Sequence, residues 1–267
     1  MSADNKTIVI LTGANSGIGY ETVRALVQSS RQYHVLFGAR SPEKGNEAMT
    51  AIKEEFPGSS TSMEMLRIDV SKDEEIDAAY ETVAKEFGRV DVLINNAGHS
   101  IENKAQGGDI TMREAWNQMF DVNVTGAHLL TTTFVPLLLK SSNPRLIFLT
   151  SGLAQMSTLS KEYYPGPPPA AGWPKANYLS PDGYRASKTA LNMVMLNWHW
   201  ALKGDGVKVW SLSPGWLATN LGRNREKLRA LGAGDPAVGG KLVKEVVEGE
   251  RDGDVGLVVA SQRIQPF

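Results

Sequence analysis

The sequence predicts a single-domain α/β protein with a doubly wound parallel sheet of about seven strands and helices on both faces. Short segments rich in Val, Ile and Leu alternate with amphipathic segments through most of the 267 residues. Strands that are buried on both faces have this continuous apolar character. No composition shift marks a second domain, so residues 1–267 are expected to form one domain around a full-sized core.

The predicted strands are short runs of β-branched and other apolar residues, and the predicted helices are longer segments with one apolar face. Pro57 and Gly58 end the second helix, and Pro136 is a potential kink in the fourth. The strands are predicted at 7–11, 33–37, 63–68, 90–94, 145–149, 207–212 and 255–259. The helices are predicted at 20–28, 42–56, 72–87, 111–140 and 182–203.

The overall composition argues against several classes of function. Lys plus Arg total 28 and Asp plus Glu total 29, so the chain lacks the basic excess typical of nucleic-acid binding. Cysteine is absent and the four histidines have no ligand spacing, so we expect no metal. The longest apolar run, 134–139, is too short to cross a bilayer, and the N-terminus does not resemble a secretory signal. We expect a cytoplasmic protein with no membrane partner.

A glycine-rich loop lies between the first predicted strand and the first helix. Gly13 can adopt the tight turn that ends the strand, Gly17 lets the backbone approach a pyrophosphate, and Gly19 allows close packing of helix on strand. The helix N-terminus then offers free N–H groups to phosphates. This context predicts a dinucleotide-binding Rossmann fold.

The end of the second strand indicates which nicotinamide cofactor is bound. A carboxylate there would bind the ribose 2′-hydroxyl of NAD, whereas an arginine would pair with the 2′-phosphate of NADP. The strand ends in Gly38-Ala39-Arg40, without a carboxylate. A guanidinium binds two phosphate oxygens at once, so we expect NADP(H).

Tyr184 and Lys188 open a predicted helix and lie four residues apart, so both side chains share one helical face. A lone tyrosine has a pKa near 10 and is a poor proton donor and acceptor at neutral pH. A neighbouring ammonium group is expected to lower that pKa. The pair could therefore serve as a general acid and base for a carbonyl/alcohol couple.

These motifs together resemble the short-chain dehydrogenase/reductase family. The loop reads TGxxxGIG from Thr12, NNAG follows the fourth strand from Asn95, and PGxxxT follows the sixth strand from Pro214. The resemblance implies a catalytic set of Ser151, Tyr184, Lys188 and Asn123. In that set Ser151 would hydrogen-bond the substrate carbonyl, although a plain turn serine is the alternative. Asn123, a poor residue for a helix interior, would bend its helix and hold a water connected to Lys188.

The resemblance also extends the expected cofactor site. Asp69 would contact the adenine, although a carboxylate at a helix N-terminus is an equally acceptable interpretation. The expected cofactor-binding residues are Gly13, Asn15, Ser16, Gly17, Ile18, Gly19, Arg40, Asp69, Val70, Asn96, Ala97, Gly98, Tyr184, Lys188, Pro214, Gly215 and Thr219.

One segment departs from the family pattern. The proline-rich insertion at 155–181 separates Ser151 from Tyr184, and it is either a solvent-side loop or a lid over the site. Monomeric carbonyl reductases of the family carry an insertion at this point, so a monomer and a homo-oligomer both stay open. The 219–250 segment is expected to form helices on the substrate side.

We therefore expect an NADPH-dependent reductase, or the reverse dehydrogenase, acting on the carbonyl or secondary alcohol of a small molecule. Trp173, Tyr163, Tyr164 and Trp216 suggest an apolar or aromatic substrate. The alternative is a nucleotide-binding protein of the same fold with a non-redox role, as a cofactor-sensing regulator or a cyclase.

Overall fold

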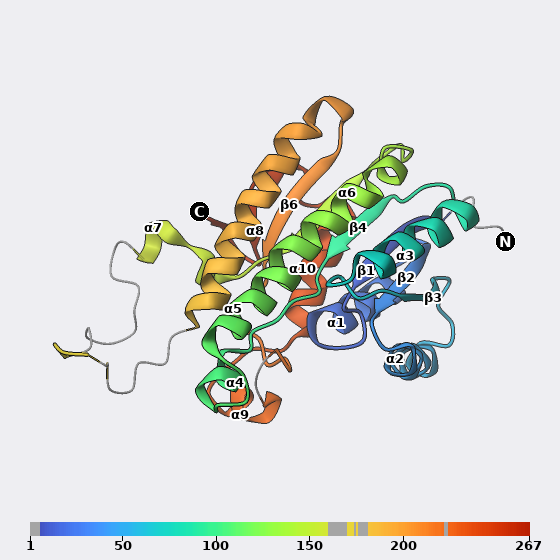
Figure 1. The fold of residues 1–267 in the computed structure, drawn as a ribbon. Coiled ribbons are helices and arrows are strands. Elements are labelled where there is room, and N and C mark those ends of the chain that lie inside the picture. The colour runs from blue at the N-terminus through green and yellow to red at the C-terminus, as the bar shows by residue number, and fades with distance from the viewer. Residues whose placement is uncertain (1–5, 160–169, 174, 176–180, 222–223) are drawn as a thin grey trace.

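The computed structural model describes residues 6–159, 170–173, 175, 181–221 and 224–267. Its centre is an eight-stranded sheet with the strand order β3-β2-β1-β4-β5-β6-β7-β8 (Figure 1). The strands are β1 Thr7–Thr12, β2 Tyr33–Ala39, β3 Ser62–Arg67, β4 Val92–Asn95, β5 Arg145–Leu149, β6 Lys208–Ser213, β7 Val258–Ala260 and β8 Ile264–Gln265. All neighbours pair in parallel except β7 and β8, which pair antiparallel.

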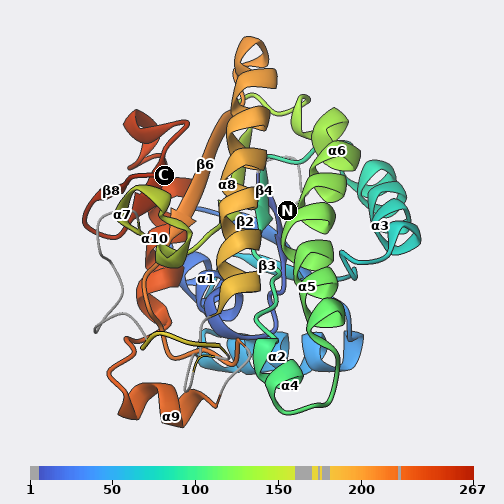
Figure 2. The same ribbon diagram turned by 60° about the vertical axis from the view of Figure 1, so that its left-hand side comes forward.

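Helices cover both faces of the sheet and make a three-layer molecule (Figures 1 and 2). The helices longer than two turns are α1 Gly17–Val27, α2 Pro42–Glu55, α3 Asp73–Glu86, α5 Met112–Phe120, α6 Ala127–Leu138, α8 Asp182–Ala201 and α10 Ala237–Val247. The shorter elements are α4 Glu102–Gln106, the π-helix η2 Asp121–Gly126, η3 Gly152–Ala154, α7 Met156–Leu159, η4 Lys203–Asp205, α9 Arg225–Ala230 and η5 Asp252–Asp254. One core cluster joins the sheet to α3, α6 and α8, and a second joins it to α1, α2 and α10.

The strand order reverses direction between β1 and β4. From β1 the chain winds outward through β2 and β3, and then it returns to β4 and winds the other way. At such a switch point the loops that leave adjacent strands diverge and open a crevice at their carboxyl ends. α4 and α9 lie at this end of the molecule (Figures 1 and 2).

The predicted doubly wound architecture is confirmed, with two differences in detail. The sheet gains an eighth strand, β8, whose two residues are too few to give a sequence pattern. The single helix predicted at 111–140 is instead α5, η2 and α6 in succession. The irregularity falls at 121–126 and not at Pro136, which lies inside α6.

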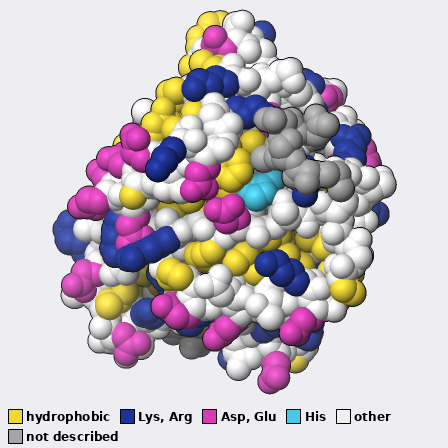
Figure 3. All heavy atoms as spheres, turned by 90° about the vertical axis from the view of Figure 1, so that its right-hand side faces the viewer, with side chains coloured by type: hydrophobic (Ala, Val, Ile, Leu, Met, Phe, Trp, Pro, Cys, Tyr) yellow, Lys and Arg dark blue, Asp and Glu magenta, His cyan; other side chains and the backbone are white. Residues whose placement is uncertain are grey.

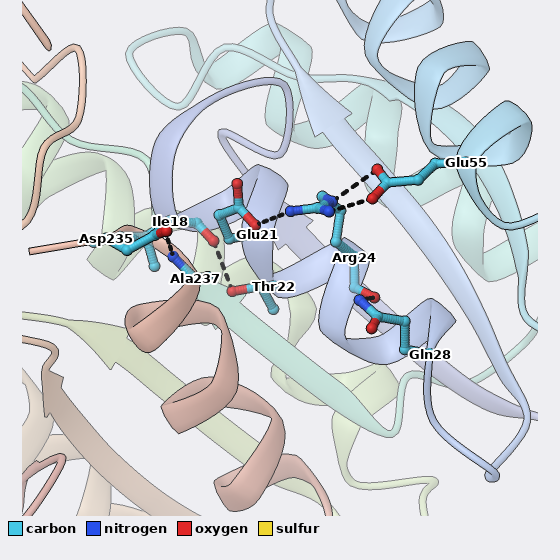
Figure 4. A network of polar contacts seen from close by, with 8 residues as sticks. All are labelled: Ile18, Glu21, Thr22, Arg24, Gln28, Glu55, Asp235 and Ala237. Atoms are coloured by element: carbon cyan, nitrogen blue, oxygen red, sulfur yellow. Dashed lines mark hydrogen bonds and ion pairs between the residues drawn. The ribbon is translucent and has the colours of Figure 1, made fainter. Parts of the chain in front are cut away.

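α1, which carries the glycine loop at its start, is held tightly by α10 and α2. The guanidinium of Arg24 pairs with Glu21 on its own helix and with Glu55 of α2 (Figure 4). On the α10 side the contact is backbone to backbone, because a Cβ placed on Gly240 would lie 2.4 Å from the carbonyl of Glu21. α10 therefore belongs to the core. Among the described residues of the 219–250 segment, those that border the crevice are Thr219, Asn220 and Leu221.

Charged side chains of both signs are interspersed on the face seen in Figure 3, with apolar patches between them. This agrees with the near-neutral formal charge of −1. Among the described residues, no helix combines the length and apolar character needed to span a bilayer.

The contact between α1 and α10 yields a stability prediction. Gly240→Ala should lower the free energy of unfolding by about 1–3 kcal/mol, because the new methyl group meets main-chain atoms that cannot move aside. Denaturant unfolding measures the change. Gly204→Ala is the matched control, since nothing lies within 4 Å of a Cβ at that position. Equal stability of the two variants would contradict the close approach.

Candidate active site

A cavity of about 320 Å³ lies at the carboxyl ends of the central strands. It is bounded by the glycine loop, the segments that follow β2, β3, β4 and β5, and the first turns of α8. Its lining includes fourteen of the seventeen predicted cofactor residues: Gly13, Asn15, Ser16, Gly17, Ile18, Arg40, Asp69, Val70, Asn96, Ala97, Gly98, Tyr184, Lys188 and Thr219. The cavity thus brings together residues that are up to 206 positions apart, from Gly13 to Thr219.

The glycine loop has the backbone that its sequence predicts. Gly13 and Gly17 adopt φ values of 66° and 56°, which disfavour residues with a side chain. A Cβ on Gly19 would lie 2.3 Å from the carbonyl oxygen of Gly13, so this glycine serves close packing and does not line the cavity. α1 begins at Gly17, and its free N–H groups therefore lie at the cavity edge.

The segment after β4 is tied to this loop by hydrogen bonds. The Asn96 side chain donates to the carbonyl of Thr12 at 2.7 Å, and the Thr12 hydroxyl accepts from the backbone N–H groups of Asn96 and Ala97 at 3.1 Å. Asn95, one residue earlier, points into the core and donates to Thr131. The NNAG segment therefore braces the glycine loop and also lines the cavity.

Arg40 lies at the end of β2 with its exposed side chain at the cavity. His99 also lines the cavity. Burial lowers the pKa of His99, and the positive charge of Arg40 lowers it further. Asp69 also lines the cavity, but its carboxylate accepts bonds from the backbone and hydroxyl of Ser71 in a local turn. The turn does not distinguish between the two interpretations of Asp69.

Tyr184 and Lys188 lie in the first two turns of α8, with exposures of 8% and 4%. The Lys188 ammonium donates to the carbonyl of Leu149 at the end of β5, at 2.7 Å. It lies 5.9 Å from the centre of the Tyr184 ring. Both side chains also line the cavity, as their spacing along the helix predicts.

The electrostatics of this pair differ from the sequence prediction. Burial raises the pKa of Tyr184 to about 12. The Ser151 hydroxyl opposes this rise, and the negative charge of Glu102 adds to it by a smaller amount. Burial also lowers the pKa of Lys188 to about 8. Desolvation disfavours the charged form of each group and is the largest cause of both shifts.

Asn123 occupies the middle of the π-helix and is 1% exposed. Its side chain accepts from the backbone N–H of His99 at 2.7 Å, and donates to the carbonyl of His99 and the hydroxyl of Ser187, both at 2.9 Å. These bonds join the helix to the wall of the cavity and to α8. A Cβ on Gly98 would lie 3.1 Å from Asn123 Oδ1 and 3.3 Å from Lys188 Nζ, so the backbone of Gly98 lies close to both side chains.

Ser151 follows β5 and caps the short η3 helix, where its hydroxyl accepts from the N–H of Leu153 at 3.1 Å. Despite the intervening insertion, its hydroxyl lies close enough to Tyr184 to oppose the rise in the pKa of the phenol. Behind it, the buried side chain of Gln265 on β8 donates to the carbonyl of Ser151 at 3.1 Å. The C-terminal strand thus supports the serine.

Several predicted features lie away from the cavity or outside the described residues. Pro214 and Gly215 follow β6, but of that segment Thr219, Asn220 and Leu221 line the cavity. Most of the insertion, with Tyr163 and Tyr164, lies outside the described residues, so the lid interpretation is not tested. No group of three or more potential metal ligands occurs within the described ranges.

Sequence reasoning missed residues that act through tertiary contacts. Glu102, Thr150, Ser187 and Gln265 are buried and form hydrogen bonds with the segments that carry the predicted catalytic residues. The position of Ser187 between Tyr184 and Lys188 was a weak indication in the sequence that it belongs to the site. Glu102 and Gln265 lie in no local sequence pattern that would indicate a role.

Comparison with known proteins agrees with this architecture. A sequence model described as short chain dehydrogenase matches residues 7–166, more than half of the chain. The chain is 48% identical over 270 aligned positions to short-chain dehydrogenase/reductase tropE of Talaromyces stipitatus, with full coverage of both proteins. It is 44% identical to short-chain dehydrogenase/reductase eupG of a Phoma species over 94% of this chain and 93% of that protein.

Among solved structures, the NADPH-bound carbonyl reductase from chicken fatty liver has the same fold. It matches with a TM-score of 0.76 and 21% identity, covering 98% of this chain and 100% of that one.

Burial of the Lys188 ammonium predicts that the free energy of unfolding depends on pH. Because the pKa of Lys188 falls from 10.5 to about 8 on folding, the unfolded chain binds more protons between these values. The free energy of unfolding should therefore rise with pH across this window, by roughly 3 kcal/mol from this group. Lys188→Met should lose that rise, which denaturant unfolding at a series of pH values measures.

Lys203→Met, at an exposed position, is the matched control and should keep the wild-type slope. Parallel stability curves for wild type and Lys188→Met would show that burial does not lower the pKa of Lys188.

Proposed function

The chain belongs to the short-chain dehydrogenase family, and from this premise we propose that it is an NADPH-dependent reductase of small carbonyl compounds. Hydride would pass between the nicotinamide and a carbonyl or secondary alcohol carbon. One observation carries the proposal: the Tyr184–Lys188 pair opens into the same cavity that the glycine loop and Arg40 line. A proton donor and a dinucleotide site thus share one space.

The residues present fit a nicotinamide dinucleotide. The start of α1 offers N–H groups to a pyrophosphate, and Arg40 at the end of β2 suits a 2′-phosphate. Gly98 keeps the wall beside Lys188 free of a side chain. The chicken carbonyl reductase, which shares this fold, binds NADPH, and this supports the same choice of cofactor.

The chemistry divides between the cofactor and this chain's own residues. When bound, NADPH supplies the hydride that reduces the carbonyl carbon. Tyr184 donates a proton to the carbonyl oxygen, and Ser151 hydrogen-bonds and polarises that oxygen. Lys188 stabilises the tyrosinate left behind and binds the nicotinamide ribose. Asn123 holds the water through which a proton returns towards Lys188.

The raised pKa of Tyr184 leaves the phenol protonated but makes it a weak acid at neutral pH. A general acid must carry its proton at the start of each turnover, and transfer of that proton requires stabilisation of the tyrosinate. The positive charge of oxidised nicotinamide would then stabilise the tyrosinate as it forms.

The substrate is proposed to be apolar or aromatic. Leu221 borders the cavity, and Trp216, five positions earlier in the chain, is 57% exposed. Exposed apolar side chains beside a site commonly form a binding wall. No observation favours the non-redox alternative, since a pure nucleotide binder needs no proton donor beside its cofactor.

Replacement of the proton donor tests the proposed function. Tyr184→Phe should reduce NADPH-dependent carbonyl reduction by at least about a thousandfold, because the hydroxyl supplies the proton. The dissociation constant for NADPH should change little. Steady-state assays across aldehydes and ketones, with fluorescence titration of NADPH, measure both. Turnover near the wild-type rate in this variant would refute the assignment.

Replacement of the arginine tests the choice of cofactor. Arg40→Ala should raise the dissociation constant for NADPH by roughly ten- to a hundredfold, because a charge-assisted pair with phosphate is lost. The constant for NADH, which lacks the phosphate, should change much less. Arg31→Ala, an exposed arginine outside the cavity lining, is the control. Equal weakening for both cofactors would argue against a phosphate contact.

A further inference from the structure

α8 begins without a capping side chain of its own. Its N-cap is Pro181, which has no side-chain oxygen, and no side-chain cap bond occurs there. The first N–H groups of any helix lack partners within the helix and need an acceptor from elsewhere. The missing cap at α8 bears on the proposed function, because Tyr184 is the third residue of this helix.

A distant carboxylate takes the place of the missing cap. Oε1 of Glu102, from α4, accepts a hydrogen bond from the backbone N–H of Tyr184 at 2.6 Å. The two residues are 82 positions apart, and Glu102 is 6% exposed. Its second oxygen accepts from the hydroxyl of Ser100 at 3.3 Å. Short bonds of this kind between a carboxylate and a backbone N–H are strong.

Among the described residues, no basic side chain forms an ion pair with this carboxylate. None of the ion pairs within the described ranges includes Glu102, so the positive end of α8 is the compensation that the structure gives it. A buried carboxylate costs free energy unless it is compensated. Such a costly group beside a proton donor suggests a role beyond packing.

Within the described part of the chain, few other charges act on Tyr184. Tyr184 belongs to a hydrophobic cluster whose other members come from α4, α5, η3 and the residues just before α4 and α5: Ile101, Ala105, Ile110, Ala115, Met119 and Leu153. The groups that can act electrostatically are the Ser151 hydroxyl, the Lys188 ammonium and Glu102. Glu102 is the negative charge in this set, and it raises the pKa of the phenol in addition to the larger effect of burial.

We propose that Glu102 is a positioning residue that fixes Tyr184 by capping the start of α8 and that its negative charge acts on the acid–base behaviour of the same tyrosine. This inference rests on the function proposed above. A negative charge at the start of α8 opposes loss of the phenol proton, so Glu102 extends towards higher pH the range in which the hydroxyl can act as a general acid. It also joins the wall that follows β4 to the catalytic helix.

Two substitutions separate the two parts of this role. Glu102→Gln keeps an oxygen that can accept from the Tyr184 N–H but removes the charge. Glu102→Ala removes both. Glu47→Gln, at an exposed position on α2, is the matched control for the loss of one carboxylate. Rates of carbonyl reduction and alcohol oxidation are measured against pH, together with NADPH affinity and thermal unfolding.

In Glu102→Gln, the fall of the reduction rate at high pH should begin at a lower pH than in wild type. The rise of the oxidation rate should shift in the same direction. In Glu102→Ala, kcat should fall by roughly ten- to a hundredfold at unchanged NADPH affinity, because a small misplacement of the donor is costly. Gln should restore most of the rate that Ala loses, and Glu47→Gln should behave as wild type.

Each contrary outcome has a separate meaning. A wild-type pH profile in Glu102→Gln would overturn the electrostatic role, and a wild-type kcat in Glu102→Ala would overturn the positioning role. Tyr184→Phe, assayed in parallel, isolates the premise: if that variant turns over normally, the proposed function fails whatever the Glu102 variants do.

Discussion

The burial of the Lys188 ammonium at the end of β5 is the constraint on which the site depends. A charged group is kept there by one main-chain carbonyl, that of Leu149, and burial lowers its pKa to about 8. The ammonium is thereby held in the cavity, one helical turn from the phenol and at the switch point between β1 and β4.

The helices around the cavity are braced against one another by polar side chains. Asn123 joins the π-helix to the backbone of His99 and to Ser187 of α8, and Glu102 joins α4 to the start of α8. A π-helix widens the turn and exposes backbone groups that an α-helix would satisfy, which is why such turns recur at functional sites. The wall after β4 and α8 are therefore linked at two separate points.

Sequence reasoning predicted the fold well because its signals are local. Alternating apolar strands and amphipathic helices, together with Gly13 and Gly17 at positive φ, depend on nearby residues. It also predicted the placement of Tyr184 beside Lys188. It did not predict β8, whose two residues carry no periodicity, or the cap from Glu102, which depends on how α4 packs against α8. The pKa of Tyr184 was missed because burial is a property of the folded chain.

The central claim is that the phenol and ammonium of α8 meet the reactive ring of a dinucleotide in one cavity, and a crystal structure of the NADP⁺ complex tests it most directly. The account predicts the adenosine 2′-phosphate at Arg40, the nicotinamide ribose at Lys188, and the Tyr184 hydroxyl facing the nicotinamide C4 across the substrate space. A bound cofactor whose nicotinamide lies away from the Tyr184 hydroxyl would contradict it.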